Sequence, residues 1–349
     1  MQTHSTKGQV QADGDLQSEP GHLVVSSPAG ARAQRVRSSV DLQTLWSRFG
    51  IYSILAIFAV GLSISNSHFL TMTNLLNVGQ QFSVLGLIAL GMLVVVITAN
   101  IDLTVGALLS LAGVVMAEIA GHTAVGFGIC AGYAVAIFSG LVAGYLSTRG
   151  RNLSIIVTLS MMTIIEGISL LVTNGQPVVT LSGVLLWFGD TDIGGVPVAI
   201  FVFAGAALLI WVFLSQTRLG RELYAVGGNA EASRLAGIPV KRRVILAFVI
   251  SGVLAATAGL ILLGQVASAQ PTVGVGDEMY AVGAVLIGGA SVNGGMGNVG
   301  KTVAGVLILG LISDGINLLS INAFIAYIVQ GGVILLAILL DQWERKGRR

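Results

Sequence analysis

Residues 295–302 (GMGNVGKT) have the types and spacing of a phosphate-binding loop, G-x-x-x-x-G-K-[ST]. Such a loop binds nucleotide phosphates when a strand precedes it, a helix follows it and a soluble nucleotide-binding fold surrounds it. Here both flanks, VGAVLIGGA and VAGVLILGLI, are apolar enough for a membrane, and a chain with 47 glycines in 349 residues meets the pattern easily by chance. We therefore interpret the stretch as a flexible connection that lets two helices pack closely, with Lys301 as an anchor at the cytoplasmic face.

Ionisable side chains inside apolar stretches form a second group that could do chemistry. Such groups are costly in a membrane and tend to face a bundle interior or water. Asp102, with Asn100 beside it, interrupts two apolar runs in ITANIDLTVG. It either lines a pathway or caps the helix that begins at Leu103, and both roles are compatible. Glu166 is deeper in its apolar segment, where it pairs with a neighbouring helix or lines a pore. Asn100, Asp102 and Glu166 are therefore the candidates for a translocation path.

The cysteine and histidine residues of the sequence do not indicate a metal site or thiol chemistry. The single cysteine, Cys130, lies in an apolar run and excludes an intramolecular disulfide or a cysteine-based metal site. The four histidines show no ligand spacing. We predict no metal site and no catalytic constellation in this chain.

The stretch 217–243 (TRLGRELYAVGGNAEASRLAGIPVKRR) is basic and lies between two long apolar segments. It contains a short helix with both ends specified. Asn229 is a good N-cap, Glu231 favours the helix dipole in the first turn, Gly237 allows a left-handed stop and Pro239 prevents continuation. A helix over 230–236 would be only about 10 Å long and needs something to pack against. It is either an ordinary cytoplasmic loop or a docking helix for a soluble partner.

Composition places these groups in a polytopic helical membrane protein. The chain is 54% hydrophobic and only 10% charged, against about 25% charged in a soluble domain. Apolar runs near 20 residues recur along it, and its many glycines suit closely packed membrane helices. We predict ten crossings, near 50–66, 80–98, 104–120, 124–147, 154–173, 196–215, 243–264, 279–291, 300–319 and 321–340.

Charge is distributed as ten crossings require. With both termini in the cytoplasm, all 18 Lys and Arg fall on the cytoplasmic side, in agreement with the positive-inside rule. The external loops instead hold acidic residues, namely Asp190, Asp192, Asp277 and Glu278. Residues 1–47 are polar without apolar periodicity, which predicts a disordered cytoplasmic tail before a transmembrane domain over 48–349.

Four stretches in this order carry a resemblance to a known family: FLTMTNLLN (69–77), GMLVVVITANIDLTVGALLSLAG (91–113), TRLGRELYAVGGNAEASRLAGI (217–238) and AVGAVLIGGASVNGGMGNVGKTVAG (281–305). From about Phe69 to Leu340 the chain resembles the permease subunits of ribose-type sugar ABC importers, in the branched-chain amino acid and ribose permease superfamily. It departs from that family at Ala99-Asn100, where two glycines are usual, and at Lys301, where a glycine is usual.

The resemblance implies a role for the short helix. In that family the loop equivalent to 228–237 is the coupling helix, which docks in a groove of the ATP-binding subunit, and Glu231, Ala232 and Gly237 match its Glu-Ala-Ala-x-x-x-Gly pattern. The coupling candidates are Gly228, Asn229, Glu231, Ala232, Arg234 and Gly237.

The resemblance also implies an all-α fold similar to the cobalamin-importer type (type II), with ten helices per subunit. A second permease subunit, identical or homologous, completes the path. An external sugar-binding protein would dock on the acidic loops, where Asp190, Asp192, Asp277 and Glu278 are candidates and solvated loop charge is the alternative. ATP and Mg would bind the partner ATPase, so this chain would be a non-catalytic subunit without a cofactor in a bacterial inner membrane.

Two other classes of function remain open. An ion-coupled secondary transporter would use Glu166 or Asp102 as its proton or sodium site, but it has no need of a capped basic helix. A membrane ATPase would use Lys301, which the apolar flanks disfavour.

Overall fold

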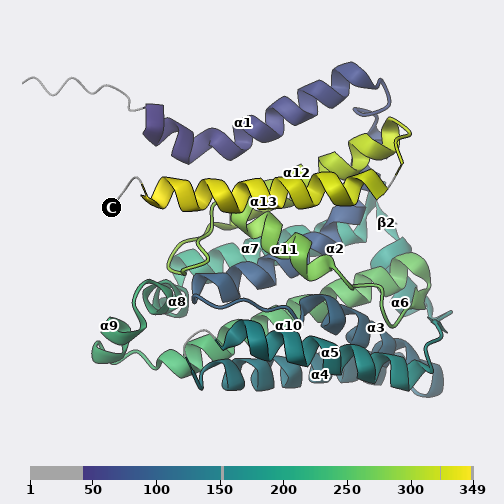
Figure 1. Cartoon of the computed structure of the whole chain (residues 1–349). Coiled ribbons are helices and arrows are strands. Elements are labelled where there is room, and N and C mark those ends of the chain that lie inside the picture. Colours follow the sequence, from purple (N-terminus) through teal and green to yellow (C-terminus); the bar gives the residue numbers. More distant parts are fainter. Residues whose placement is uncertain (1–41, 151–152, 323, 347–349) are drawn as a thin grey trace, which may run out of the picture.

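The chain folds into a bundle of long helices in a computed structural model that describes residues 42–150, 153–322 and 324–346 (Figure 1). The helices are α1 (Leu42–Ser65), α2 (Met72–Ile97), α3 (Val105–His122), α4 (Val125–Ser147), α5 (Ser154–Thr173), α6 (Gly183–Asp190), α7 (Val198–Gln216), α8 (Arg218–Gly228), α9 (Ala230–Leu235), α10 (Val240–Val266), α11 (Asp277–Ile287), α12 (Val299–Leu318) and α13 (Phe324–Lys346). Four two-residue strands pair as β1 (Val178–Val179) with β4 (Ser268–Ala269) and β2 (Asp192–Ile193) with β3 (Val196–Pro197).

The predicted all-α membrane class is confirmed. Seven helices among the described residues are long and apolar enough to cross a membrane, namely α2, α3, α4, α5, α7, α10 and α12. α1 and α13 contain shorter apolar stretches, Gly50–Ser65 and Phe324–Leu336. The ten predicted segments overlap these nine helices and α11, whose 11 residues extend only about 16 Å.

The predicted boundary of the N-terminal tail differs from the structure. α1 begins at Leu42, so 42–47 are helical rather than part of a tail, and the rest of the predicted tail, 1–41, lies outside the described residues.

The centre of the bundle is α2, packed among α10, α11 and α12. Its side chains from Leu87 to Ile97 are almost completely buried, which explains why the sequence of α2 is apolar on all sides. α10 also packs on α3 and α4 through glycines. A Cβ added at Gly252 would lie 2.6 Å from the carbonyl oxygen of Ala136, and one at Gly259 would lie 2.4 Å from that of Leu109. Small residues thus let three backbones approach closely.

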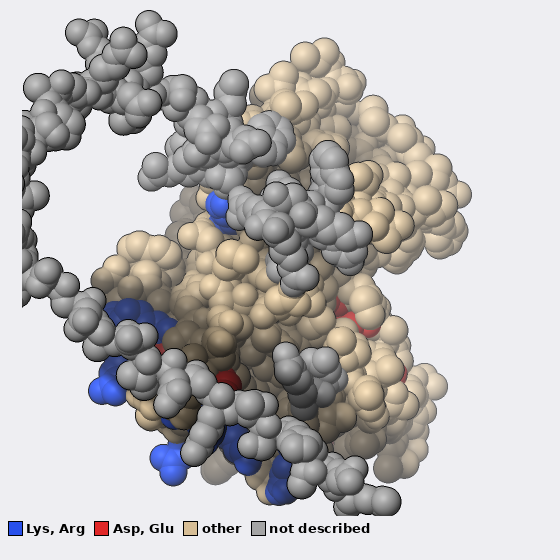
Figure 2. Space-filling view, turned by 60° about the vertical axis from the view of Figure 1, so that its left-hand side comes forward, with Lys and Arg blue, Asp and Glu red and all other residues tan. Residues whose placement is uncertain are grey.

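The two ends of the bundle carry opposite charge. One end, which we call the basic end, holds α8 and α9, and α6, β2 and β3 lie at the other, the acidic end (Figure 1). Figure 2 shows most of the visible Lys and Arg side chains gathered at the basic end, with a few acidic side chains among them, while other acidic side chains lie toward the opposite side. α1 begins and α13 ends near the basic end (Figure 1). The basic side chains concerned are Arg149, Arg218, Arg221, Arg234, Lys241, Arg242, Arg243 and Lys301.

Residues 267–276 turn back into the bundle after α10, and we call them the re-entrant segment. Gly259 packs on Leu109, about 10 Å along α10 from its end at Val266. The amide of Gly274 donates a hydrogen bond of 2.9 Å to Ser110, the next residue on α3. The re-entrant segment therefore reaches about 10 Å inside the bundle before α11 begins. Irregular backbone at this depth is tolerated where it is packed against protein, as at the buried Ala269 and Gly274, or where it faces water.

Candidate functional site

The helix predicted in the basic stretch is α9, and its ends form as the sequence indicates. The side chain of Asn229 accepts a hydrogen bond of 2.9 Å from the amide of Ala232. At the other end Gly237 has φ of +81° and its amide donates to the carbonyl of Arg234, while the amide of Ile238 donates to that of Ser233. These two bonds form a Schellman motif, so the backbone of this six-residue helix is fixed by local interactions at both ends.

The surface of α9 is almost entirely open. Gly228, Asn229, Glu231, Ala232, Arg234 and Gly237 are all exposed. Glu231 and Arg234 form an ion pair with an N–O distance of 2.6 Å. The hydrogen bond from Arg234 lowers the pKa of the Glu231 carboxyl. Leu235 is 76% exposed, so an apolar side chain lies beside the ion pair on this open surface.

α8 anchors α9 to the bundle through a buried carboxylate. Glu222 accepts a hydrogen bond of 2.8 Å from Arg218, on its own helix, and a second one from Arg243 at the start of α10. Only 7% of Glu222 is exposed. Arg243 first, and Arg218 with it, lower the pKa of this carboxyl. The bond to Arg243 ties α8 to α10, so the two helices hold α9 away from the bundle end in a fixed place.

Asp102 lies in the bend between α2 and α3 and is 1% exposed. Its Oδ1 accepts hydrogen bonds from the amide of Thr104 (3.0 Å) and from its hydroxyl (2.6 Å), and its Oδ2 accepts one from Ser251 of α10 (2.8 Å). All three bonds point into the protein. The carboxylate therefore joins the bend to α10 one turn before α3, which begins at Val105 rather than at the predicted Leu103.

The other path candidates are placed differently. The amide of Asn100 is half-buried and donates to the carbonyl and hydroxyl oxygens of Thr98, at 2.9 and 3.1 Å. Glu166 is half-buried on α5.

The four acidic candidates for external docking separate into two pairs. Asp190 and Asp192 are exposed at the acidic end. Asp277 and Glu278 were predicted to lie in an external loop, but they form the first turn of α11 inside the bundle. Glu278 is 5% exposed, and its carboxylate lies where a Cβ on Gly106 of α3 would be only 2.5 Å away. In this conformation Glu278 does not contribute to the surface of the acidic end.

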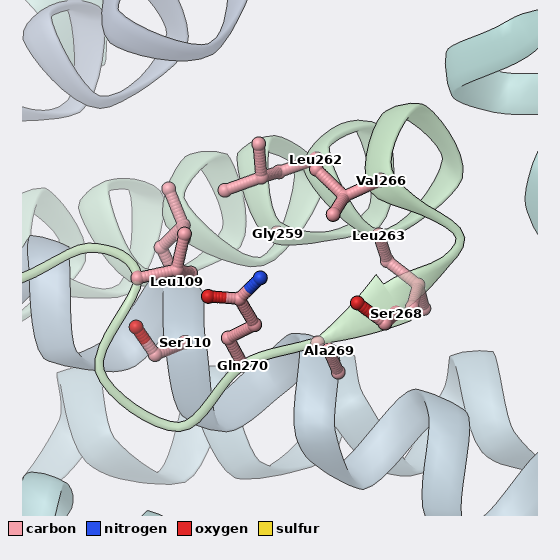
Figure 3. Close-up of a pocket in the computed structure, with 11 residues that line it drawn as sticks. Leu109, Ser110, Gly259, Leu262, Leu263, Val266, Ser268, Ala269 and Gln270 are labelled. Atoms are coloured by element: carbon pink, nitrogen blue, oxygen red, sulfur yellow. The ribbon is translucent and has the colours of Figure 1, made fainter. Parts of the chain in front are cut away.

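A small pocket lies between α3, α10 and the re-entrant segment (Figure 3). Figure 3 shows the side-chain amide of Gln270 in the middle, between Leu109 and Ser110 of α3 and the apolar residues of α10. The pocket has room for about one water molecule. A sugar-sized molecule would enter here only after the re-entrant segment moves.

Comparison with known proteins identifies the family of this chain. Residues 74–338 match the family described as the permease component of the branched-chain amino acid transport system. The chain belongs to this family. It is 39% identical to the ribose import permease protein of Escherichia coli (strain K12) over 302 residues, 85% of this chain and 94% of that one. It is 32% identical to the L-arabinose transport system permease protein of the same strain over 326 residues, 93% of this chain and 99% of that one. No solved structure matches it.

Membership of the permease family resolves the alternatives that the sequence left open. It supports the importer permease over the ion-coupled transporter, and it identifies the chain as a permease component rather than a subunit that hydrolyses ATP. The phosphate-loop pattern has a structural explanation in this permease. A helix, α11, precedes it in place of a strand, and Asn298 caps α12 by accepting a hydrogen bond of 3.1 Å from the amide of Lys301.

Sequence reasoning missed two groups at the basic end of the permease. Glu222 has no assigned role in the sequence analysis, yet it is the buried link between α8 and α10. Tyr224 donates a hydrogen bond of 2.9 Å to the carbonyl of Gly297, which is 73 residues away. The spacing of Arg218 and Glu222 at i and i+4 indicates only the pair within α8, whereas no local pattern predicts the bond from Glu222 to Arg243 or the bond from Tyr224 to Gly297.

Proposed function

We propose that this permease is the membrane-spanning subunit of an ATP-driven importer for a monosaccharide or a related polyol. The observation that carries the proposal is α9, an exposed six-residue helix with both caps formed, held away from the bundle by α8 and α10. A helix this short is marginal in water, so the two caps that fix its ends favour a surface built for a partner. The partner in the proposal is an ATP-binding subunit, which carries ATP and Mg.

The proposal includes the orientation in the membrane. The cytoplasm of a bacterial cell would contain α9, the start of α1, the end of α13 and the basic side chains. The chain would cross the inner membrane ten times. The distribution of charge between the two ends supports this orientation. A fold of the cobalamin-importer type with a second permease subunit would leave the apolar faces of α4, α5 and α7 for lipid or for that subunit, since these helices are mostly exposed.

The substrate class rests on the relatives. Their names specify ribose, L-arabinose and D-allose, and the identities are 32–39% over most of both chains. An external binding protein would deliver the sugar at the acidic end, where the exposed Asp190 and Asp192 would guide encounter with it. Asp277 and Glu278 would join that contact only in a conformation that exposes them.

The mechanism is a shift between two states of the path. ATP-driven closure of two ATPases would draw two copies of α9 together and change which end of the path is open. The path need bind sugar only weakly, because the external protein supplies the affinity. Asn100, Asp102 and Glu166 remain the candidates for lining it.

The test is co-purification of the tagged permease from its native cell in mild detergent, followed by mass spectrometry. The double variant Glu231→Arg/Arg234→Glu exchanges the two charges of the ion pair on α9 and leaves the caps at Asn229 and Gly237 unaltered, so the pattern of charge offered to a partner is lost. The matched control is Glu118→Lys/His122→Glu, which inverts another surface pair in which the two atoms lie 3.4 Å apart.

An ATP-binding subunit should accompany the wild type and the control and be absent from the double variant. Uptake of radiolabelled ribose, L-arabinose or D-allose should disappear in the double variant as well. A permease that purifies alone and still transports would refute the proposal and restore the ion-coupled transporter.

A further inference from the structure

The glycine-rich loop between α11 and α12, residues 288–298, forms a junction of three backbones. The amide of Gly295 donates a hydrogen bond of 2.8 Å to the carbonyl of Ile97, at the last residue of α2. The last turn of α8 enters the same place, because a Cβ added at Gly227 would lie 1.8 Å from that carbonyl oxygen and 2.5 Å from the amide of Gly295. No side chain fits at this crossing, so its glycines hold α8, α2 and the loop in direct backbone contact.

Tyr224 fastens the loop to α8. Its hydroxyl donates a hydrogen bond of 2.9 Å to the carbonyl of Gly297, and its ring lies one turn before Gly227 on the same helix. Gly297 in turn packs on α2, where a Cβ would meet Leu93 at 2.7 Å. The loop is therefore held from one side by α8 and from the other by α2.

The loop continues into α11, a rigid rod of 11 residues. The far end of α11 lies at the re-entrant segment, where the backbone of Gly274 contacts Gly106 so closely that a Cβ on Gly106 would be 2.2 Å from its carbonyl oxygen. A displacement of the loop along α11 must therefore move the re-entrant segment against α3. Contiguous packed elements of this kind are a physical route between two sites.

The route also has a defined beginning. α8 ends at Gly228 and Asn229 caps α9, so a force on α9 acts first on the last turn of α8. That turn carries Gly227 and follows Tyr224 directly.

We propose that the loop 288–298 transmits movement of α8 and α9 to the re-entrant segment 267–276 through α11, and that Tyr224 is the residue that positions this loop on α8. The proposal rests on the proposed function, because it requires a partner that moves α9. It gives the phosphate-loop pattern a mechanical role, since the glycines of that pattern form the junction.

The experiment measures the re-entrant segment directly. Val275 is 53% exposed, so Val275→Cys in a Cys130→Ser background reports its accessibility through the rate of labelling by fluorescein maleimide. The rate is measured on the complex with the co-purified ATP-binding subunit, with and without Mg-ATP and vanadate. Tyr224→Phe removes one hydroxyl. The matched control is Tyr133→Phe, which removes a hydroxyl that also forms a hydrogen bond of 2.9 Å between helices, from α4 to Thr257 of α10.

We expect Mg-ATP and vanadate to change the labelling rate in the wild type and in Tyr133→Phe. In Tyr224→Phe this change in the labelling rate should be about fivefold smaller, which is the factor in an equilibrium constant that one neutral hydrogen bond is typically worth. ATP hydrolysis and co-purification of the ATP-binding subunit should persist. A full ATP-dependent change in Tyr224→Phe would overturn the proposal. So would an equal loss in Tyr133→Phe, or a wild type without any change.

A second variant keeps the proposal falsifiable if Tyr224→Phe assembles poorly. Two glycines inserted between Asn293 and Gly294 lengthen the loop without altering α8, and they should also remove the ATP-dependent change. The control insertion lies between Gly194 and Gly195, in the turn from β2 to β3. Failure of the proposed function is a different outcome, in which no ATP-binding subunit co-purifies even with the wild type.

Discussion

Ala99 is a residue whose side chain conflicts with its backbone. Its φ is +61°, in the left-handed region where a Cβ costs roughly 1–2 kcal/mol. The strain lies next to the three-backbone junction, because Gly294 packs directly on Ala99. The sharp bend between α2 and α3 requires the left-handed backbone conformation at Ala99.

Ala99→Gly should therefore stabilise the permease by about 1 kcal/mol, since relief of the left-handed strain exceeds the added entropy of the unfolded chain. The measurement is the thermal midpoint of unfolding in detergent, which should rise. Ala112→Gly, in the middle of α3, is the control and should lower the midpoint, because glycine weakens a helix interior. A lower midpoint in Ala99→Gly would show that the Cβ is needed against Gly294.

Asp102 should tolerate an amide far better than an apolar side chain. Asp102→Asn keeps an oxygen for Thr104 and can donate to Ser251, whereas Asp102→Leu leaves three buried donors unpaired, at about 3 kcal/mol in total. Thermal midpoints of the two variants test this difference. Uptake of radiolabelled ribose by Asp102→Asn then separates the two interpretations of this residue. Retained uptake supports a purely structural carboxylate that joins the bend to α10, and lost uptake with an unchanged midpoint supports a path-lining carboxylate.

At the scale of elements, the attachment of α8 to α10 depends on ionisation. The folded state lowers the pKa of Glu222 through its bonds to Arg243 and Arg218. A lowered pKa means that the carboxylate stabilises the fold above the unfolded value, 4.5 for glutamate, and that this contribution is lost as the pH falls through the folded pKa. The attachment of α8 to α10 should consequently weaken in acid.

Glu222→Gln should lower the thermal midpoint at pH 7, because Arg243 would then be half-buried without its charged partner. The gap between wild type and Glu222→Gln should narrow as the pH falls below about 4.5. Thermal unfolding over pH 3–7 measures it, with the exposed Asp192→Asn as control. A gap that stays constant over this range would contradict the role of the carboxylate charge.

At the scale of the molecule, the separation of charge between the two ends sets the orientation. Single cysteines in a Cys130→Ser background, Asp192→Cys at the acidic end and Arg221→Cys at the basic end, test it with a membrane-impermeant maleimide on intact spheroplasts. Both native side chains are exposed. We expect labelling at 192 in intact spheroplasts and at 221 only after lysis, because basic loops stay in the cytoplasm. The reverse pattern would place α9 outside the cell, beyond reach of an ATPase.

The sequence by itself determined the membrane class, the family and the short helix α9. These follow from local information, since apolar runs of spanning length specify membrane helices and an N-cap with a left-handed stop specifies a short helix, predicted over 230–236 and observed over 230–235. It also indicated that the phosphate-loop pattern does not bind nucleotide, because the flanking residues are apolar. Asn229, Glu231 and Gly237 have the local structure that their residue types predict.

Only the tertiary structure decided that residues 267–276 turn back into the bundle. The polar residues before α11 have the composition of an external loop, so Asp277 and Glu278 were expected at the surface, yet Gly106 and Ser110 of α3 provide a place for the segment inside the bundle. The link from Glu222 to Arg243 and the bond from Tyr224 to Gly297 likewise join positions 21 and 73 residues apart. No periodicity or propensity contains such contacts, because they depend on which helices become neighbours when the bundle closes.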